Sequence, residues 1–146
     1  MSPVVFPYGV RLQEGVHFDV FPAVEVYIFG RRGVGLRAMF HLDSGASTSI
    51  LPITDADALG IKLNQSKKIL VRGFAGESSV GYRSSISLKI GILRLATPVV
   101  FVDAFTQRIL GREGVFPKFA IIFDELKQRT GFLDSKKNRA AVDAIF

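Results

Sequence analysis

The sequence predicts an all-β fold in one domain, and two observations lead to this prediction. Short apolar segments rich in Val, Ile, Leu and Phe recur between turn-forming residues, a pattern typical of strands and not of long helices. Of the 146 residues, 48% are hydrophobic. A chain of this length can bury one substantial core but is too short for two independent domains.

The first predicted hairpin ends at an acidic residue. Val24–Phe29 forms a strand, Gly30-Arg31-Arg32-Gly33 a turn, and Val34–Leu42 the returning strand. Asp43 therefore lies at the end of a strand. Farther along, Thr54–Gly60 predicts a single helical turn, with its threonine as the cap and its glycine as the terminator.

The second half of the chain continues the β pattern. Lys68–Arg72 and Ser79–Ile90 flank the glycine-bounded tip Gly73–Glu77, which predicts a long hairpin. Further strands are expected at Ala96–Phe101, Ile109–Gly111, Phe119–Phe123 and Thr130–Leu133. In the tail, Asp134–Phe146, the apolar residues Val142, Ile145 and Phe146 have helical spacing behind a cap at Asp134 or Ser135. We expect a terminal helix there.

Charge and composition narrow the classes of function. Lys and Arg number 19 against 13 Asp and Glu, a net charge of +6, but the cations are scattered and their densest groups are only pairs, which argues against a nucleic-acid footprint. The absence of cysteine excludes disulfides, thiolate metal sites and a cysteine nucleophile. No apolar run approaches the ~20 residues that cross a bilayer, and the N-terminus does not have the pattern of a signal peptide. The expected location is the cytoplasm.

The segment from His41 to Pro52, HLDSGASTSILP, places a single carboxylate between apolar flanks. Asp, Ser and Gly are ordinary turn formers, so the tripeptide alone has a purely structural explanation. The apolar residues on both sides nevertheless predict that Asp43 is partly desolvated.

Three segments occur in an order that resembles the retropepsin-like aspartic proteases. They are Asp43-Ser44-Gly45-Ala46, the glycine-rich tip around residues 73–77, and Ile109-Leu110-Gly111-Arg112. The likeness extends to the closing hairpin and covers residues 22–133, leaving an N-terminal arm, residues 1–21, and a tail, residues 134–146. It implies the acid-protease barrel of that family, active as a twofold homodimer.

The chemistry of such a site requires two carboxylates. Held close together they share one proton, so that one activates water while the other donates a proton, without metal or cofactor. This chain contains one Asp-Ser-Gly motif. A homodimer would supply the second Asp43 across a twofold axis.

The resemblance also assigns supporting roles. Ser44 would form a hydrogen bond across the axis, and Gly45 would admit the substrate backbone. The hairpin at residues 69–90 would be a flap, with Gly73 and Gly76 providing flexibility and the backbones of Phe74 and Ala75 contacting an extended peptide. On its own, the same pattern fits an ordinary exposed hairpin.

The third segment and His41 leave alternatives open. Ile109-Leu110-Gly111 would run beneath the active-site loop, or would be only a buried strand. In the family, the arginine equivalent to Arg112 pairs with an acid after the tripeptide, but Ser47 stands there in this chain, so Arg112 needs another partner. His41 either lines the substrate pocket or is hydrogen-bonded at the edge of the core.

These observations predict an aspartic endopeptidase that cleaves extended peptides as a homodimer. The first alternative is the same fold acting as a dimerisation or peptide-binding module with little or no turnover, because fold does not guarantee activity. A small basic β-barrel that binds RNA is a third interpretation, based on net charge alone. A serine triad from Ser44, His41 and Asp43 is excluded, because adjacent strand residues point to opposite faces.

Overall fold

In the computed structural model, strands dominate the described residues, which are 2–12, 17–73, 75–104 and 106–146. Two short α-helices, α1 (Ile53–Ala58) and α2 (Arg139–Asp143), and two 3-10 turns at Gln65–Lys67 and Phe116–Lys118 accompany them. The strands are β1 (Val4–Pro7), β2 (Gly9–Leu12), β3 (Phe18–Phe21), β4 (Ala23–Phe29), β5 (Gly35–Leu42), β6 (Ser49–Pro52), β7 (Lys68–Arg72), β8 (Ser78–Ile90), β9 (Leu93–Val102), β10 (Ile109–Leu110), β11 (Phe119–Asp124) and β12 (Arg129–Asp134). The mainly β prediction is confirmed.

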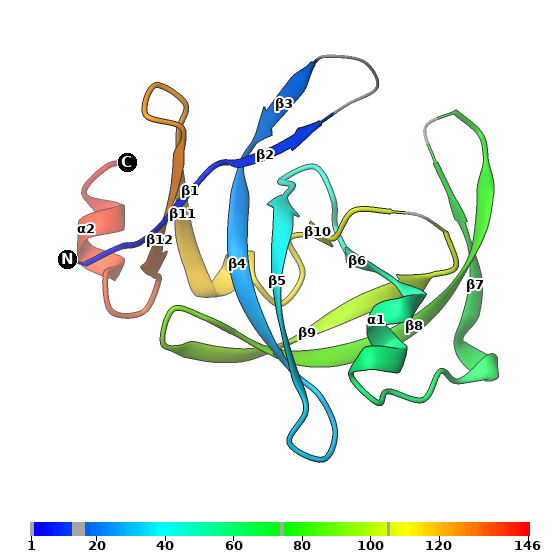
Figure 1. The fold of residues 1–146 in the computed structure, drawn as a ribbon. Helices are drawn as coiled ribbons and strands as arrows, with labels where there is room; N and C mark the ends of the chain where they lie inside the picture. The colour runs from blue at the N-terminus through cyan, green and yellow to red at the C-terminus, as the bar shows by residue number, and fades with distance from the viewer. Residues whose placement is uncertain (1, 13–16, 74, 105) are drawn as a thin grey trace.

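The largest sheet has the strand order β4-β5-β10-β6-β9-β8-β7 (Figure 1). An additional pairing of β4 with β8, from Tyr27↔Lys89 to Phe29↔Ser87, joins one edge strand to the strand next to the other edge. The sheet therefore curves strongly around its buried face. The short strand β10 lies between β5 and β6, and this arrangement determines where the segment between those two strands is held.

The core lies on one face of this sheet. In β4 the buried residues are Ala23, Val24, Val26 and Ile28, and in β5 they are Ala38, Phe40 and Leu42, so that from Val24 in β4 and Ala38 in β5 every second side chain is buried. Leu51, Phe101 and Leu110 extend the same core from β6, β9 and β10. The side chains on the opposite face of these strands point away from this core.

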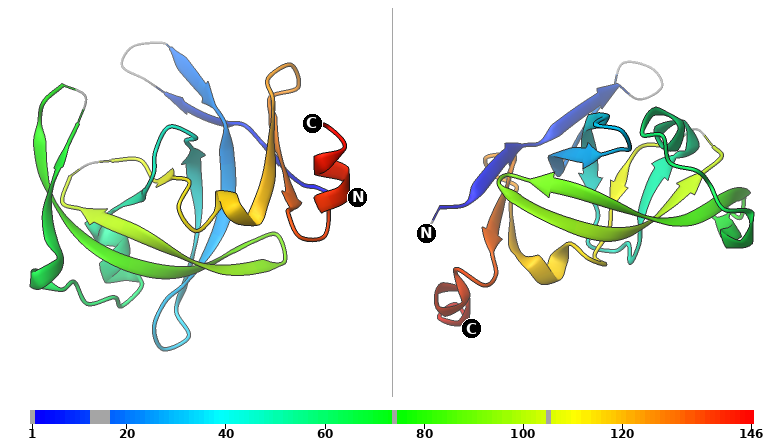
Figure 2. Two further views of the ribbon diagram at one scale, coloured as in Figure 1. Left: turned by 180° about the vertical axis from the view of Figure 1, so that it is seen from behind. Right: turned by 90° about the horizontal axis from the view of Figure 1, so that it is seen from below.

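The N-terminal segment contributes strands to the fold. β1 pairs antiparallel with β12, which pairs in turn with β11, forming a three-stranded sheet (Figure 2). Both chain ends lie on the side of that sheet. β2 and β3 form a separate two-stranded hairpin. The arm expected from the sequence is thus structured over residues 4–12 and 18–21.

Most predicted strands are confirmed to within a few residues, but the helix caps differ. α1 begins at Ile53, and Pro52 occupies the capping position without a side-chain hydrogen bond. The predicted cap at Thr54 is therefore wrong, because the helix starts directly at the end of β6. α2 is preceded by Asn138, while Asp134 accepts hydrogen bonds from the N–H groups of Lys136 and Lys137 in the turn before the helix.

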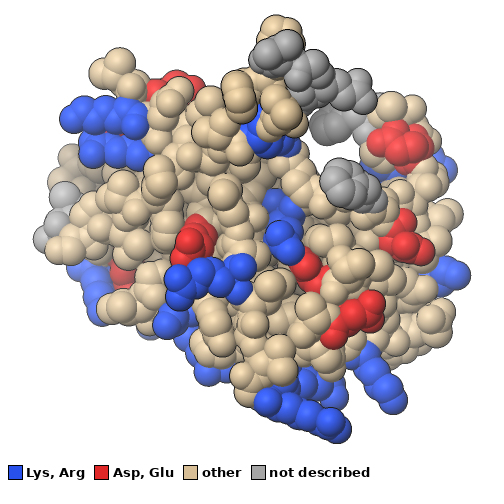
Figure 3. Space-filling view, viewed as in Figure 1, with Lys and Arg blue, Asp and Glu red and all other residues tan. Residues whose placement is uncertain are grey.

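The apolar stripe predicted for the tail packs only in part. Val142 is buried, whereas Ile145 and Phe146 are exposed, because α2 ends at Asp143 before these two residues. Among the described residues, no helix has the length and apolar character needed to cross a membrane. Lys and Arg side chains are spread in separate groups over the face shown in Figure 3.

Candidate active site

The loop that carries Asp43 is fixed at both ends by β10. β10 runs parallel to β5, with Ile109 opposite His41 and Leu110 opposite Leu42. It runs antiparallel to β6, with Ile109 opposite Ile50. Because the strands on either side of residues 43–48 share this partner, the loop is closed across the end of β10.

Asp43 lies at the start of this loop and is half-buried. Its backbone N–H donates to the carbonyl oxygen of Leu110 at 3.0 Å. Its side-chain Oδ1 accepts a 2.8 Å hydrogen bond from the N–H of Gly45. The first bond positions the backbone and the second orients the carboxylate, while the side chain of Ser44 remains exposed at the loop surface.

Gly111 passes directly beneath the loop. A Cβ atom at this position would lie 2.7 Å from the carbonyl carbon of Thr48 and 2.9 Å from the carbonyl oxygen of Ala46, so only glycine fits. The N–H of Gly111 donates to the buried Oγ of Ser49 at 2.9 Å. The next two N–H groups, of Arg112 and Glu113, donate to the carbonyls of Ala46 and Ser47, both at 2.9 Å. This segment therefore supports the loop from below.

A row of side chains crosses the sheet on the face opposite the core. Residues directly opposite each other in paired strands share a face. The pairings His41↔Ile109, Ile109↔Ile50, Ile50↔Val100 and Val100↔Arg83 connect five strands in this way. Most of these side chains are half-buried or exposed, whereas their core-facing neighbours Leu42, Leu110, Leu51 and Phe101 are buried.

His41 begins this row and does not contribute to the core face. Its ring stacks on Phe21 of β3, with centroids 5.1 Å apart and planes inclined by 22°. The contact ties the β2–β3 hairpin to the strand that leads into Asp43. Among the described residues, no side-chain hydrogen bond of His41 accompanies this stacking, so the edge-of-core alternative has no hydrogen-bonding partner there.

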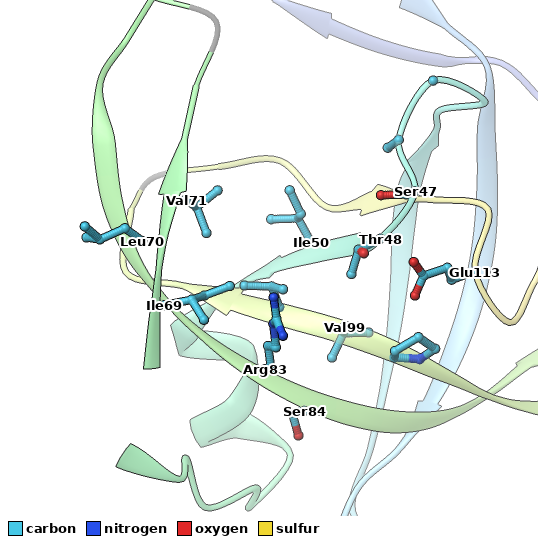
Figure 4. A pocket seen from close by; sticks show the side chains of 14 residues that line it. Ser47, Thr48, Ile50, Ile69, Leu70, Val71, Arg83, Ser84, Val99 and Glu113 are labelled. Atoms are coloured by element: carbon cyan, nitrogen blue, oxygen red, sulfur yellow. The ribbon is translucent and has the colours of Figure 1, made fainter. Parts of the chain in front are cut away.

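A cavity of about 750 Å³ opens beside the loop. The loop borders it on one side and β7 on another (Figure 4). Ile50, Val100 and Arg83 of the row described above also line it, and we call these three residues the floor of the cavity. Its lining begins at Gly45, two residues after Asp43. Arg83 and Glu113 are the ionisable residues among those that line it.

The β7–β8 hairpin forms the wall facing the loop. Figure 1 shows it extending past the body of the sheet. At its tip the N–H of Gly73 donates to the carbonyl of Glu77 at 2.9 Å, and the N–H of Gly76 donates to the carbonyl of Gly73 at 3.2 Å. Gly73, Ala75 and Gly76 are exposed, and Phe74 lies outside the described residues.

Arg112 is exposed, and no ion pair within the described part of the chain involves it. A different arginine, Arg108, forms a partly buried ion pair near the site. Arg108 donates from Nε and from a terminal guanidinium nitrogen to the two carboxylate oxygens of Asp55, at 2.6 and 2.8 Å. This hydrogen bonding raises the pKa of Arg108 above its ordinary value, against the opposing effect of partial burial.

The Asp55–Arg108 pair positions the strand beneath the active-site loop. Asp55 in α1 is 4% exposed, and the carbonyl of Arg108 accepts a 2.8 Å hydrogen bond from the N–H of His41. The pair therefore anchors the residue that precedes β10 to α1. Sequence reasoning missed it, and the available signals were an acid in the first turn of the helix and an arginine directly before β10.

A family model described as aspartyl protease matches residues 24–114. This span is more than half of the chain and contains the Asp43 loop, the β7–β8 hairpin and β10. The chain belongs to the aspartyl protease family. The predicted family is confirmed, and the enzyme class that follows is aspartic-type peptidase.

Two solved structures share the fold of this aspartyl protease. EIAV protease complexed with the inhibitor HBY-793 is 22% identical, covers 63% of this chain and 82% of its own, and has a TM-score of 0.51. A retropepsin-like aspartic protease from Rickettsia conorii is 18% identical, covers 90% of this chain and 94% of its own, and has a TM-score of 0.53. None of the curated proteins compared with the protease matches its sequence.

Proposed function

We propose that the protein is an aspartic endopeptidase whose active site forms between two copies of the chain. The observation that carries this proposal is the single Asp-Ser-Gly-Ala loop, which holds a half-buried Asp43 at the end of β5. One carboxylate cannot act as both general base and general acid in the same step. The partner's Asp43, brought in by a twofold axis, would supply the second group.

In the proposed reaction the two carboxyl groups share one proton. The ionised group accepts a proton from a water molecule, whose oxygen attacks the carbonyl carbon of the substrate, while the protonated group donates to the carbonyl oxygen. The tetrahedral intermediate then breaks its C–N bond, as the carboxyl group that took the proton from water donates it to the leaving amine and the other carboxylate accepts a proton from a hydroxyl of the intermediate.

Three loop residues support this chemistry. The hydrogen bond from the N–H of Gly45 to Oδ1 of Asp43 orients the carboxylate before substrate binds. The exposed hydroxyl of Ser44 is available for a hydrogen bond to the partner's loop. The missing side chain of Gly45, together with its exposure, lets a substrate backbone approach closely.

An extended peptide is the substrate that fits the surroundings of the loop. The side-chain row from His41 to Arg83 provides a mainly apolar floor next to Asp43. The β7–β8 hairpin would cover the bound peptide, with Gly73, Ala75 and Gly76, and with Phe74 from the resemblance to the family. Main-chain hydrogen bonds from such a cover suit an extended chain of varied sequence.

The partner copy must approach the end of the molecule that carries residues 43–48. The β2–β3 hairpin lies at this end, because Phe21 stacks on His41 (Figure 1). One face of the hairpin is apolar and exposed, and its four residues are Val10, Leu12, Phe18 and Val20. Its other face carries the Arg11–Asp19 ion pair and the contact of Arg11 with Phe21. The exposed apolar face supports a homodimer by offering surface to the second copy.

The test is cleavage of a peptide library from acid to neutral pH by the wild type and by Asp43→Asn, with light scattering on both proteins. We expect the substitution to abolish cleavage while the dimer persists. Cleavage that is unchanged in Asp43→Asn would remove the proposal. Peptide binding by the wild type without hydrolysis at any pH would support the alternative of a binding module.

A further inference from the structure

The row of side chains that forms the floor of the cavity ends at a positively charged residue, Arg83. From Ile109 through Ile50 to Val100 the row of side chains is aliphatic, and the next strand contributes Arg83 directly opposite Val100. Figure 4 shows the Arg83 side chain directed into the cavity between Ile69 and Val99. In the described residues no carboxylate forms an ion pair with it.

The second charged group of the cavity lies on a different wall. Glu113 follows the segment beneath the loop, and Figure 4 shows its carboxylate near Ser47 and Thr48. Arg112, its neighbour in sequence, is an exposed cation. A carboxylate that enters the cavity would be repelled from the Glu113 wall and attracted to the Arg83 wall, so the two charges together favour one orientation.

We propose that this cavity is the subsite for an acidic side chain of the substrate, with Arg83 as the residue that determines this specificity. The inference rests on the proposed peptidase function. A guanidinium favours a carboxylate because the two form charge-assisted hydrogen bonds, and the exposed Arg83 is accessible to an entering side chain. The net charge of +6 also attracts acidic peptides at longer range.

The alternative is that Glu113 selects a basic side chain. Two features of the cavity favour Arg83 instead. Arg83 lies opposite Val100 in the row, where a substrate side chain would extend along Ile50 and Val100, whereas Glu113 is outside that row and directly follows the exposed cation Arg112 in the sequence. The two assignments predict opposite preferences, so a peptide series separates them.

The experiment measures kcat/KM for peptides that carry Glu, Gln or Lys at each position around the scissile bond. At one position we expect the wild type to prefer Glu over Gln by about tenfold. Arg83→Gln should abolish this preference, and Arg83→Glu should convert it into a preference for Lys. Glu113→Gln should increase the preference for Glu. Arg31→Glu, in the exposed β4–β5 turn, is the control and should preserve the wild-type pattern.

A binding assay separates failure of this inference from failure of the proposed function. Fluorescence anisotropy with the same peptides and Asp43→Asn should show the same order, Glu above Gln above Lys, and Arg83→Glu in that background should reverse it. A binding preference without wild-type cleavage would support the subsite and contradict the peptidase. Three results would each overturn the inference. They are equal affinity and kcat/KM for the Glu, Gln and Lys peptides, the absence of both binding and cleavage, and an unchanged preference in a folded Arg83→Glu variant.

Discussion

The backbone N–H of Gly111 donates a 2.9 Å hydrogen bond to Oγ of Ser49, and both residues are buried beneath the loop that carries Asp43. The bond joins β6 to the residue that follows β10. It therefore holds together β6 and the segment after β10, which together position the loop relative to the sheet. The hydroxyl of Ser49 therefore supports the loop by accepting this hydrogen bond. Ser44 and Ser47 are exposed and do not share this role.

Replacing Ser49 with Ala should lower the free energy of unfolding by about 1–3 kcal/mol, because the buried N–H of Gly111 would lose its acceptor. Urea denaturation followed by circular dichroism measures this change. Ser78→Ala is the matched control, since Ser78 is exposed in β8, and should change the free energy of unfolding by less than about 0.5 kcal/mol. Equal effects of the two substitutions would show that the Ser49 bond does not stabilise the loop.

Replacing Gly111 with Ala adds only one methyl group, but it should reduce the activity strongly. The new Cβ would lie 2.7–2.9 Å from backbone atoms of Thr48 and Ala46, so the active-site loop must move. We expect a loss of about 1–3 kcal/mol in stability and a drop in kcat with a smaller change in KM. Steady-state kinetics and thermal denaturation measure these effects.

Gly131→Ala provides the control for that substitution. A Cβ at Gly131 in β12 would lie 3.9 Å from its nearest neighbours, which is ordinary contact. This variant should be as active as the wild type and at least as stable, since alanine restricts the unfolded chain. If Gly111→Ala were as active as Gly131→Ala, the loop would tolerate displacement and its support by Gly111 would have no catalytic importance.

The strands and the family could be predicted from the sequence because both depend on local patterns. Alternating apolar residues identify β4 and β5, and the Asp43 motif is contiguous. The row from His41 to Arg83 was not predictable, since it depends on the registers of four strand pairings and a shift by one residue would reverse every side chain. The Asp55–Arg108 pair joins residues 53 positions apart, and no local pattern connects them.

The N-terminal strands were missed for a related reason. β1 is stabilised by pairing with β12, more than 120 residues later in the chain, so its segment looks like an arm when examined alone. The Thr54 cap was assigned from residue preference, which the direct passage from β6 into α1 overrides. In both cases tertiary contacts decide a structure that local preference leaves open.

Placing a charge on the β2–β3 hairpin should weaken the proposed dimer. Leu12 and Phe18 are opposite each other and are 66% and 69% exposed, so Leu12→Asp should have little effect on the folded monomer. It should raise the dimer dissociation constant at least tenfold, measured by sedimentation equilibrium, and reduce activity at low protein concentration. Ile92→Asp, in the exposed β8–β9 turn, should change neither. A Leu12→Asp variant that dimerises like the wild type would place the interface elsewhere.

Mixing wild type with Asp43→Asn tests directly whether each active site needs two chains. Random exchange at equal concentrations leaves about one quarter of the dimers with two wild-type subunits. If a mixed dimer, with one carboxylate and one carboxamide, cannot perform the acid and base steps, activity per wild-type chain should fall to about half. Adding bovine serum albumin in place of the variant controls for dilution and adsorption. An active site contained within one chain predicts no change in activity per wild-type chain at any mixing ratio, so the dependence on ratio distinguishes a shared catalytic pair from an independent one.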